Sequence, residues 1–413
     1  MIELKLLYGF MVVLHVLTVA HLCYASRNRS PLSIEKVEVM KHLNRLNIPL
    51  VKSIKSPDGD TIDCVHISNQ PAFDHPLLKN HTIKTKPSYY PNWVKDDNMN
   101  MNASKVGQIT SSSKETINQL WHSNGKCPKG TIPIVRINYG KKKRNLPVDQ
   151  PNFIDPRLTS VGLGHEYAYA SIEGHFYGSK ATFNLWNPKV QEPKEFSLGQ
   201  LWIVGGPQSN VNTIEAGWHV DPEIHDGDTN TRLFIYWTSD GYQKTGCYNL
   251  GCSGFIQTNN EIAIGGSFSP TSQVDGSQYE ITILIWKDPK EGDWWMKLGD
   301  SVVGYWPASL FSYLHESAST LEWGGEIINL NSNGHHTTTQ MGSGYFPEAG
   351  LGKASYIKNI QTVDESNTLK PPQNLIALAP QKSCYNILMG TNDNQNWGSH
   401  FFYGGPGRNE NCP

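Results

Sequence analysis

Alternating apolar and polar residues mark most of the chain after residue 160. A two-residue period places successive side chains on opposite faces of a strand, so each such segment predicts a strand. The predicted strands cover 167–174, 181–187, 196–206, 212–220, 231–239, 254–258, 261–268, 279–288, 294–300, 302–307, 321–328 and 354–364. So many short strands predict an all-β fold, a β-sandwich or a barrel, with one short helix at 309–317.

The first part of the chain has a different, mixed pattern. Residues 30–55 are predicted to begin as a helix at Ser30 and Pro31, because apolar residues then recur at helical spacing. A strand is predicted over 62–67, so this part forms a small α+β domain.

The segment 138–160 divides these two parts. It combines a basic run, KKKR, with several prolines, a composition that suits an exposed linker where proteases cut. We therefore predict a signal peptide at 1–25, a small domain at 26–137, a linker at 138–160 and a β domain at 161–413.

Composition and charge narrow the possible partners. The 413 residues carry a formal net charge of −2 at pH 7, which gives no field that would recruit nucleic acid or anionic lipid. With 37 Gly and 25 Pro but only 17% charged residues, the chain suits a turn-rich β protein.

The N-terminus has the features of a secretory signal peptide. Lys5 precedes an apolar run that is short for a bilayer span, and small residues follow near Ala25. A signal anchor is the alternative. We expect a secreted protein with no membrane segment after cleavage, directed to the extracellular space, the apoplast or the vacuole.

Cysteines and sequons fit this expectation. Loss of Cys23 leaves an even number, which in an oxidising compartment predicts three disulfides. Proximity in sequence favours pairing Cys64 with Cys127, Cys247 with Cys252, and Cys384 with Cys412. A metal site at the second pair is disfavoured, because no further Cys or His pair accompanies it. Glycosylation sequons occur at Asn28, Asn80 and Asn102.

Carboxylates inside apolar strands are the candidate chemistry. In NTIEAGWHV, alternation places Glu215 and Gly217 on the face opposite the large apolar residues, and LEWGGEII does the same for Glu322 and Glu326. Glycine beside a carboxylate leaves space for another chain or a ligand. Two glutamates that converge there would form an acid/base pair, because mutual repulsion raises one pKa.

Two other interpretations of these residues stay open. The glutamates are ordinary surface charges if this face of the sheet contacts water. Two carboxylates among many aromatic residues also describe a glycosidase, and exposed tryptophans suit a non-catalytic protein that binds cell-wall sugars.

Many segments resemble the plant neprosin family. They include LWIVGGP, NTIEAGWHV, IAIGGS, LIWKDPKEGDWW, VVGYWPASLFSYL, EWGGEI and FYGGPGRN. The stretch VKSIKSPDGDTIDCVHISNQPAFDHPLLKNH is similar to that family's activation domain. The resemblance covers nearly all of the chain after residue 25.

The resemblance implies a secreted glutamic endopeptidase made as a zymogen, with an antiparallel β-sandwich that cuts after proline at acidic pH. It implies Glu215 and Glu326 as the catalytic pair and needs no metal or cofactor. Glu215 is the first candidate for the general base, and the reverse assignment stays open.

Further expectations follow from this resemblance. The substrate is a proline-containing peptide, the chain's own pro-domain inhibits it, and the protein is a monomer. Processing is expected after Pro156, with Pro147 and Pro151 as alternatives, and a charged His219 is expected to depress the pKa of Glu215. Candidate substrate-binding residues are Trp218, His219, Trp323 and Tyr345, and core packing stays open as the alternative for the three aromatic rings.

Overall fold

The structure is a computed structural model, and it describes residues 49–93, 118–136, 164–243, 245–251, 253–390 and 397–413. Leu50–Pro413 form one compact unit. The predicted signal peptide, the linker with Pro156, and the sequons at Asn28 and Asn102 lie outside the described residues.

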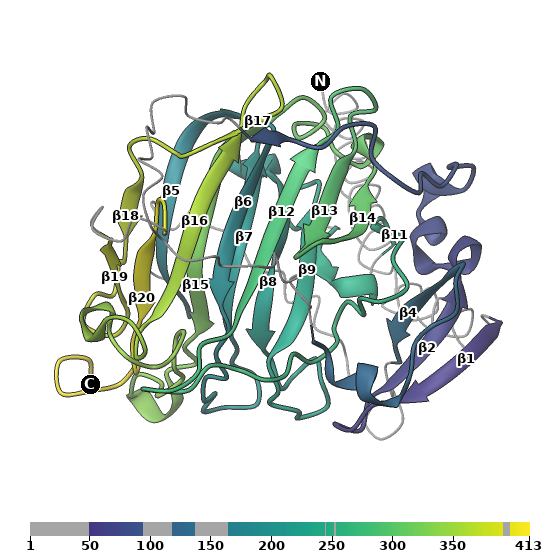
Figure 1. The fold of residues 1–413 in the computed structure, drawn as a ribbon. Coiled ribbons are helices and arrows are strands. Elements are labelled where there is room, and N and C mark those ends of the chain that lie inside the picture. Colours follow the sequence, from purple (N-terminus) through teal and green to yellow (C-terminus); the bar gives the residue numbers. More distant parts are fainter. Residues whose placement is uncertain (1–48, 94–117, 137–163, 244, 252, 391–396) are drawn as a thin grey trace, which may run out of the picture. The chain divides into compact units, whose positions relative to one another are not determined.

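One large antiparallel sheet carries the strands with the unusual glutamates (Figure 1). Its strands, in spatial order, are β10 (Cys247–Tyr248), β9 (Arg232–Thr238), β8 (Asn212–Val220), β7 (Ser197–Gly205), β15 (Ala318–Ile328), β5 (His165–Phe176) and β18 (Ile376–Leu378). The spatial order shows that β7 lies between β8 and β15, although β15 comes about 100 residues later in the chain.

A second sheet packs against the first. Its main path is β11 (Ile256–Gln257), β14 (Ser301–Trp306), β13 (Trp294–Leu298), β12 (Glu280–Lys287), β6 (Gly178–Asn184), β16 (Ser355–Val363), β17 (Thr368–Lys370) and β3 (Asn92–Trp93). Strands β19 (Asn386–Met389) and β20 (Phe401–Gly404) extend it from β16. The predicted all-β antiparallel sandwich is therefore confirmed.

A small third sheet precedes the sandwich. It consists of β1 (Leu50–Lys55), β2 (Thr61–His66) and β4 (Thr131–Val135). All helices among the described residues are short 3₁₀ segments: η1 (Ile67–Asn69), η2 (Pro71–Asp74), η3 (Pro76–Leu78), η4 (Leu120–Asn124), η5 (Gln208–Asn210), η6 (Asn249–Gly251), η7 (Ala308–Leu310), η8 (Ser332–Gly334) and η9 (Pro347–Ala349). None of these described helices is long and apolar enough to cross a bilayer.

Three secondary-structure predictions were wrong. Residues 50–55, predicted as the end of a helix, form the strand β1, which pairs with β2. Residues 261–268 make only isolated bridges, since the backbone turns at Gly265, where φ is 85°. The helix at 309–317 reduces to η7, and further along the backbone N–H groups of Tyr313 and Leu314 donate to Asn212 Oδ1 rather than within a helix.

The core lies between the two large sheets and is rich in tryptophan. Trp218 of β8 and Trp323 of β15 are both completely buried there, together with Trp286 and Trp294 of the opposite sheet. The alternation of each strand therefore sends these rings inward and leaves its glutamates on the outer face.

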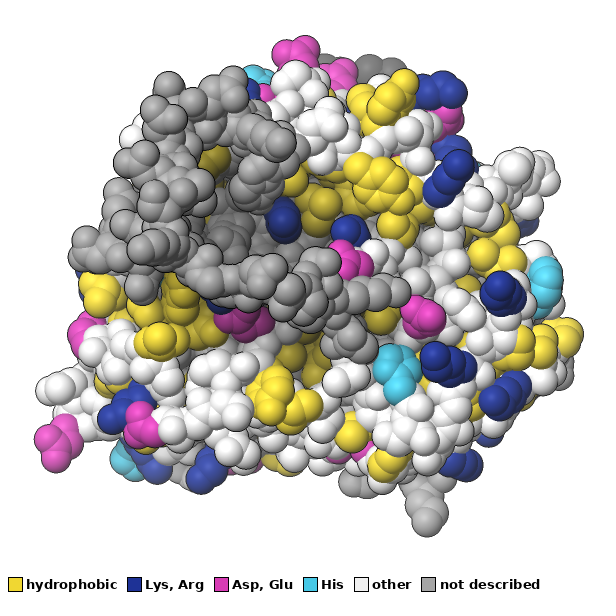
Figure 2. Space-filling view, in the orientation of Figure 1, with side chains coloured by type: hydrophobic (Ala, Val, Ile, Leu, Met, Phe, Trp, Pro, Cys, Tyr) yellow, Lys and Arg dark blue, Asp and Glu magenta, His cyan; other side chains and the backbone are white. Residues whose placement is uncertain are grey.

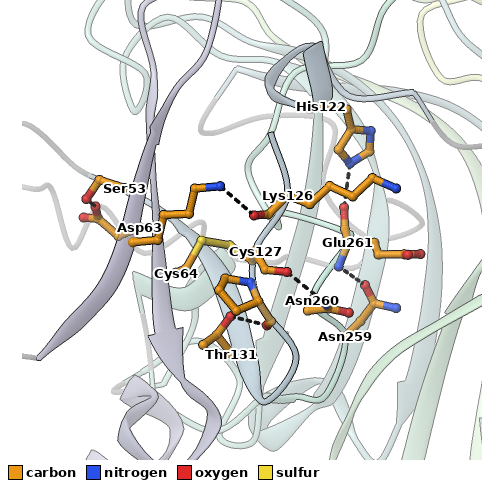
Figure 3. Close-up of a disulfide and its surroundings, with 12 residues drawn as sticks. Ser53, Asp63, Cys64, His122, Lys126, Cys127, Thr131, Asn259, Asn260 and Glu261 are labelled. Carbon is orange, nitrogen blue, oxygen red and sulfur yellow. Dashed lines mark hydrogen bonds between the residues drawn. A yellow bond between two sulfur atoms is a disulfide. The ribbon is translucent and has the colours of Figure 1, made fainter. Parts of the chain in front are cut away.

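A disulfide joins β2 of the small sheet to the segment that precedes β4 (Figure 3). Cys64 of β2 bonds Cys127, as predicted, and Asn260 Nδ2 donates to the Cys127 carbonyl at 3.0 Å. The predicted Cys384–Cys412 bridge is also present. The predicted partner of Cys247, Cys252, lies outside the described residues.

A buried arginine joins the small sheet to the sandwich. Arg232 of β9 is 1% exposed, and its Nη1 donates to Asp60 Oδ2 at 2.5 Å, in the turn between β1 and β2. The same guanidinium donates to Asp228 Oδ2 at 2.7 Å. Since β9 is the neighbour of β8, the N-terminal part contacts the strand beside Glu215.

Candidate active site

Two glutamates lie on either side of one glutamine on the outer face of the first sheet. Gln200 of β7 is opposite Gly217 of β8 and Gly324 of β15 in the strand register. Glu215 lies two residues before Gly217, and Glu326 lies two residues after Gly324. The pair therefore approaches Gln200 from diagonally opposite corners, over two positions that lack side chains.

The two glycines cannot be replaced without moving this arrangement. A Cβ on Gly217 would lie 2.0 Å from the carbonyl oxygen of Gly199 and 2.8 Å from the Cβ of Gln200. A Cβ on Gly324 would lie 2.3 Å from the carbonyl oxygen of Ala168. The mid-strand glycines thus permit close approach of the neighbouring strands.

Gln200 connects the two carboxylates directly. Its Nε2 donates to Glu326 Oε2 at 3.3 Å, and its side chain also hydrogen-bonds Glu215. Gln200 is 1% exposed, and its Oε1 has no hydrogen-bond partner among the described groups. A single amide therefore links the two carboxylates.

Glu215 lies in a largely apolar environment with two hydroxyl donors. Oε1 accepts hydrogen bonds from Thr213 Oγ1 at 2.7 Å and from Tyr242 OH at 2.9 Å. Burial is the main cause that raises the pKa of Glu215 to about 7, and the negative charge of Glu326 raises it further. The protonated form of Glu215 is therefore favoured at acidic pH.

Glu326 has a different set of neighbours. His165 Nδ1 lies 2.5 Å from Oε1, and the Tyr167 side chain is a further hydrogen-bond partner. Burial and the charges of Glu326 and Glu215 raise the pKa of Tyr167 well above 10, so that its hydroxyl stays a donor. Gln200 and Tyr167 can therefore donate to Glu326, and so can His165 when Nδ1 carries its proton.

The third glutamate, Glu322, lies further along β15. It is opposite Trp202, which is in turn opposite Glu215, so the Trp202 ring position separates the two carboxylates. Ser171 Oγ donates to Glu322 Oε1 at 3.1 Å.

Aromatic side chains surround these polar groups. A buried cluster on this face contains Tyr169, Phe196, Leu198, Trp202, Val211, Phe234, Tyr236 and Tyr242, with Tyr167 and Tyr248 packed against it. The glutamates themselves are 7% exposed. Low dielectric strengthens electrostatic interactions in such a site.

Two predicted substrate-binding residues are corrected by the structure. Trp218 and Trp323 point into the core between the sheets, and both are 0% exposed. Trp323 Nε1 donates to Ser179 Oγ at 3.0 Å within that core. Neither ring is available to a ligand on the glutamate face, because alternation sends it to the other side of the sheet.

The other two candidate substrate-binding residues, His219 and Tyr345, differ in their exposure to solvent. His219 lies on the glutamate face but is 0% exposed, stacked on Phe234 at 4.8 Å. Burial, aided by Arg232, lowers the pKa of His219 to about 3, so it stays neutral and the predicted effect of its charge on Glu215 is wrong. Tyr345 is 43% exposed, and its backbone carbonyl lies near Gly404 of β20.

Two other places in the described part of the chain have features of a ligand site. His336 lies close to Cys384 and Cys412, but these cysteines form a disulfide and cannot bind a metal. A cavity of about 500 Å³ opens on the outer face of the second sheet, between Lys180 and Lys297. Figure 2 shows basic and hydrophobic side chains around a hollow on this face, which is not the face of the glutamates.

The sequence analysis did not predict five residues that complete the site: Thr213, His165, Tyr167, Gln200 and Tyr242. A signal existed for Gln200, which is the one large polar residue in the apolar segment LGQLWIVGG. Tyr242 gives no such signal. It adopts φ 61°, an uncommon left-handed conformation for an aromatic residue, in the loop after β9. The predicted glycosylation site Asn80 is exposed.

Comparison with known families supplies the context for this geometry. The neprosin family model matches residues 193–406, just over half of the chain, and the neprosin activation peptide model matches residues 53–171. The chain belongs to the neprosin family. The resemblance found in the sequence is thus confirmed, including the activation peptide. Membership supports a peptidase, a hydrolase with an intramolecular pro-domain.

Several solved structures share weaker likeness with this neprosin. One is Scytalido-glutamic peptidase with a peptide-based transition state analogue, at 11% identity over 59% of this chain and 98% of that chain, with a TM-score of 0.32. Another is SCP-B, an Eqolisin family peptidase in complex with the tripeptide Ala-Ile-His, at 10% identity over 59% and 98%, with a TM-score of 0.30. A third is CG-16, a homodimeric agglutinin from chicken liver, at 13% identity over 38% and 93%, with a TM-score of 0.22. These likenesses are too weak to bear on the chemistry.

Proposed function

We propose that this neprosin is a glutamic endopeptidase in which Glu215 and Glu326 form the catalytic pair. The observation that carries the proposal is the amide of Gln200, which hydrogen-bonds both carboxylates on one face of the sheet. Two carboxylates that share a site take up protons at separate pH values, as general acid and general base require.

The protonation of Glu215 supports a division of roles. With a pKa of about 7, Glu215 is the proton donor below neutral pH. Glu326, surrounded by donors, is the base. This assignment reverses the first expectation from the sequence, which took Glu215 as the base.

The hydrolysis then balances as follows. Glu326 takes one proton from a water molecule as the water oxygen bonds the scissile carbonyl carbon, while the Glu215 carboxyl donates a hydrogen bond to the developing oxyanion. The carbon–nitrogen bond breaks, the leaving amine takes the Glu215 proton, and an acid and an amine result. Proton exchange with solvent returns Glu326 to its ionised form and Glu215 to its protonated form.

An acidic working range follows from this scheme. Glu215 loses the proton it must donate as the pH rises through about 7, so activity falls above neutrality. We also propose cleavage after proline, as the family resemblance implies. The aromatic cluster around the glutamates supports it, because flat rings pack well against a pyrrolidine ring.

The N-terminal part is proposed to inhibit the enzyme until it is removed. Asp60 in the turn of the small sheet pairs with Arg232, on the strand beside Glu215. We propose secretion as well, since the two disulfides suit an oxidising compartment. A monomer and processing after Pro156 stay predictions.

A quenched peptide with one internal proline tests the proposal. The secreted full-length protein, incubated at acidic pH, should cleave it, whereas Glu215→Gln and Glu326→Gln should each lose about 10²-fold or more in kcat. The matched control Glu316→Gln, at an exposed glutamate, should keep full activity. Cleavage at the wild-type rate by either dyad variant would refute the assignment.

The same experiment separates the alternatives. Equal cleavage of a peptide with alanine in place of proline would remove the prolyl specificity and leave the peptidase. Sugar release from polysaccharide, abolished in both dyad variants, would indicate a glycosidase. Glycan binding with no hydrolysis of either substrate would indicate a binding protein.

A further inference from the structure

A histidine contacts one glutamate of the pair and has no place in the hydrolysis described above. The Nδ1 atom of His165 lies 2.5 Å from Glu326 Oε1, and the two side chains are 17% and 10% exposed. In the part of the chain that the structure describes, this is the one ion pair formed by either Glu215 or Glu326.

The backbone fixes the position of His165 at the start of β5. His165 is opposite Ile328 in the register with β15. The carbonyl of Gly164 accepts a hydrogen bond from Asn329 N at 2.6 Å, and a Cβ on Gly164 would lie only 2.2 Å from Asn329 O. The backbone just before His165 has φ 76° at Gly164, a conformation that favours glycine. The backbone direction at the start of β5 is therefore fixed.

The ring of His165 is held as well. It stacks on Tyr167 with centroids 6.3 Å apart and planes 18° apart, and it meets Phe196 edge-on at 5.9 Å. These two contacts keep Nδ1 directed at Glu326, so the ring does not have to be ordered when substrate arrives.

Other ionisable groups near Glu326 are acids or neutral donors. Four ionisable side chains on other strands of the sheet interact with Glu326: Tyr167 on β5, Glu215 on β8, Tyr236 on β9 and Tyr248 on β10. Glu322, on the same strand as Glu326, interacts with Tyr167. In the proposed hydrolysis Glu326 acts as the ionised base. A protonated imidazole within about 4 Å of a carboxylate favours the ionised form of that carboxylate.

We propose that His165 is a positioning residue that keeps Glu326 ionised at acidic pH and thereby sets the lower pH limit of hydrolysis. This inference rests on the proposed function, because it assigns Glu326 the role of base. His165 itself transfers no proton to or from the substrate. Processing anywhere within the predicted linker at 138–160 leaves His165 in the mature chain.

The pH profile of kcat tests the proposal. His165→Asn keeps an N–H donor near the Nδ1 position but removes the positive charge, and His165→Ala removes both. The acidic limb of the profile should move to higher pH by about one unit in His165→Asn and further in His165→Ala, with KM little changed. His175→Asn, at an exposed histidine of the same strand, is the matched control and should leave the profile unchanged.

A second readout separates this inference from the peptidase proposal. Carboxyl titration by carbon-13 NMR, with Glu326 assigned from the Glu326→Gln variant, should show Glu326 ionising at higher pH in His165→Asn than in the wild type. Glu326 titration that is unchanged in both His165 variants would overturn the inference. Loss of all peptidase activity in the wild type would instead overturn the proposed function, while the titration still reports the ion pair.

Discussion

Glu215 makes stability depend on pH in a direction opposite to that of an ordinary glutamate. Its pKa is about 7 in the folded protein, against 4.5 for the free side chain. Between these values the folded state holds a proton that the unfolded chain releases. The contribution of Glu215 to stability is therefore fully present below about pH 4.5 and is lost as the pH rises through 7.

The size of this effect follows from the pKa difference. Each unit is worth about 1.4 kcal/mol, so the full difference corresponds to about 3 kcal/mol. Glu215→Gln mimics the protonated side chain at every pH. Its free energy of unfolding should equal that of the parent near pH 4 and exceed it by about 3 kcal/mol at pH 8.

Urea denaturation followed by tryptophan fluorescence measures this difference. The parent and the Glu215→Gln variant should both also carry Glu326→Gln, which prevents self-hydrolysis. This background also removes the Glu326 charge, so the expected gain at pH 8 is smaller than about 3 kcal/mol but still positive, because burial is the larger cause of the raised pKa. Glu316→Gln, at an exposed residue, should show no pH-dependent gain. A gap between Glu215→Gln and its parent that is constant from pH 4 to 8 would refute the reasoning.

Three further variants test the surroundings of the pair. Arg232→Met should lower the free energy of unfolding by about 3 kcal/mol, because it leaves Asp58, Asp60 and Asp228 without their buried partner. Lys297→Met at an exposed pair should cost less than about 1 kcal/mol, and equal costs would contradict the buried network. Trp323→Phe should leave KM unchanged in the peptide assay, whereas a raised KM would restore this ring as a substrate contact. Gly217→Ala should lower kcat at least about tenfold by displacing Gln200, and an unchanged kcat would show that the glutamine does not position the pair.

The sequence predicted the local parts of this site well. Alternation placed Glu215 and Gly217 on one face of β8, and the predicted limits of that strand, 212–220, equal the observed ones. Alternation also placed Trp218 and Trp323 on the opposite face. The pattern alone therefore favours core packing for those two rings over contact with substrate, and both lie in the core.

The remaining parts depend on which strands are neighbours. Gln200 lies between the two glutamates because β7 separates β8 from β15, and the period of a single strand carries no information on its partners. His165 reaches Glu326 through the pairing of β5 with β15, across more than 150 residues of chain. Tyr242 depends on one left-handed residue in a loop. Such contacts arise only in the assembled sheet.

The most direct test of the central claim is the kcat/KM of Glu215→Gln, Glu326→Gln and the double variant on one proline-containing peptide at acidic pH. Two residues that act as one unit give non-additive losses. We predict that both single variants fall to the same low residual rate and that the double variant falls no further. Losses that multiply in the double variant, or a single variant that keeps its activity, would contradict a shared acid/base pair.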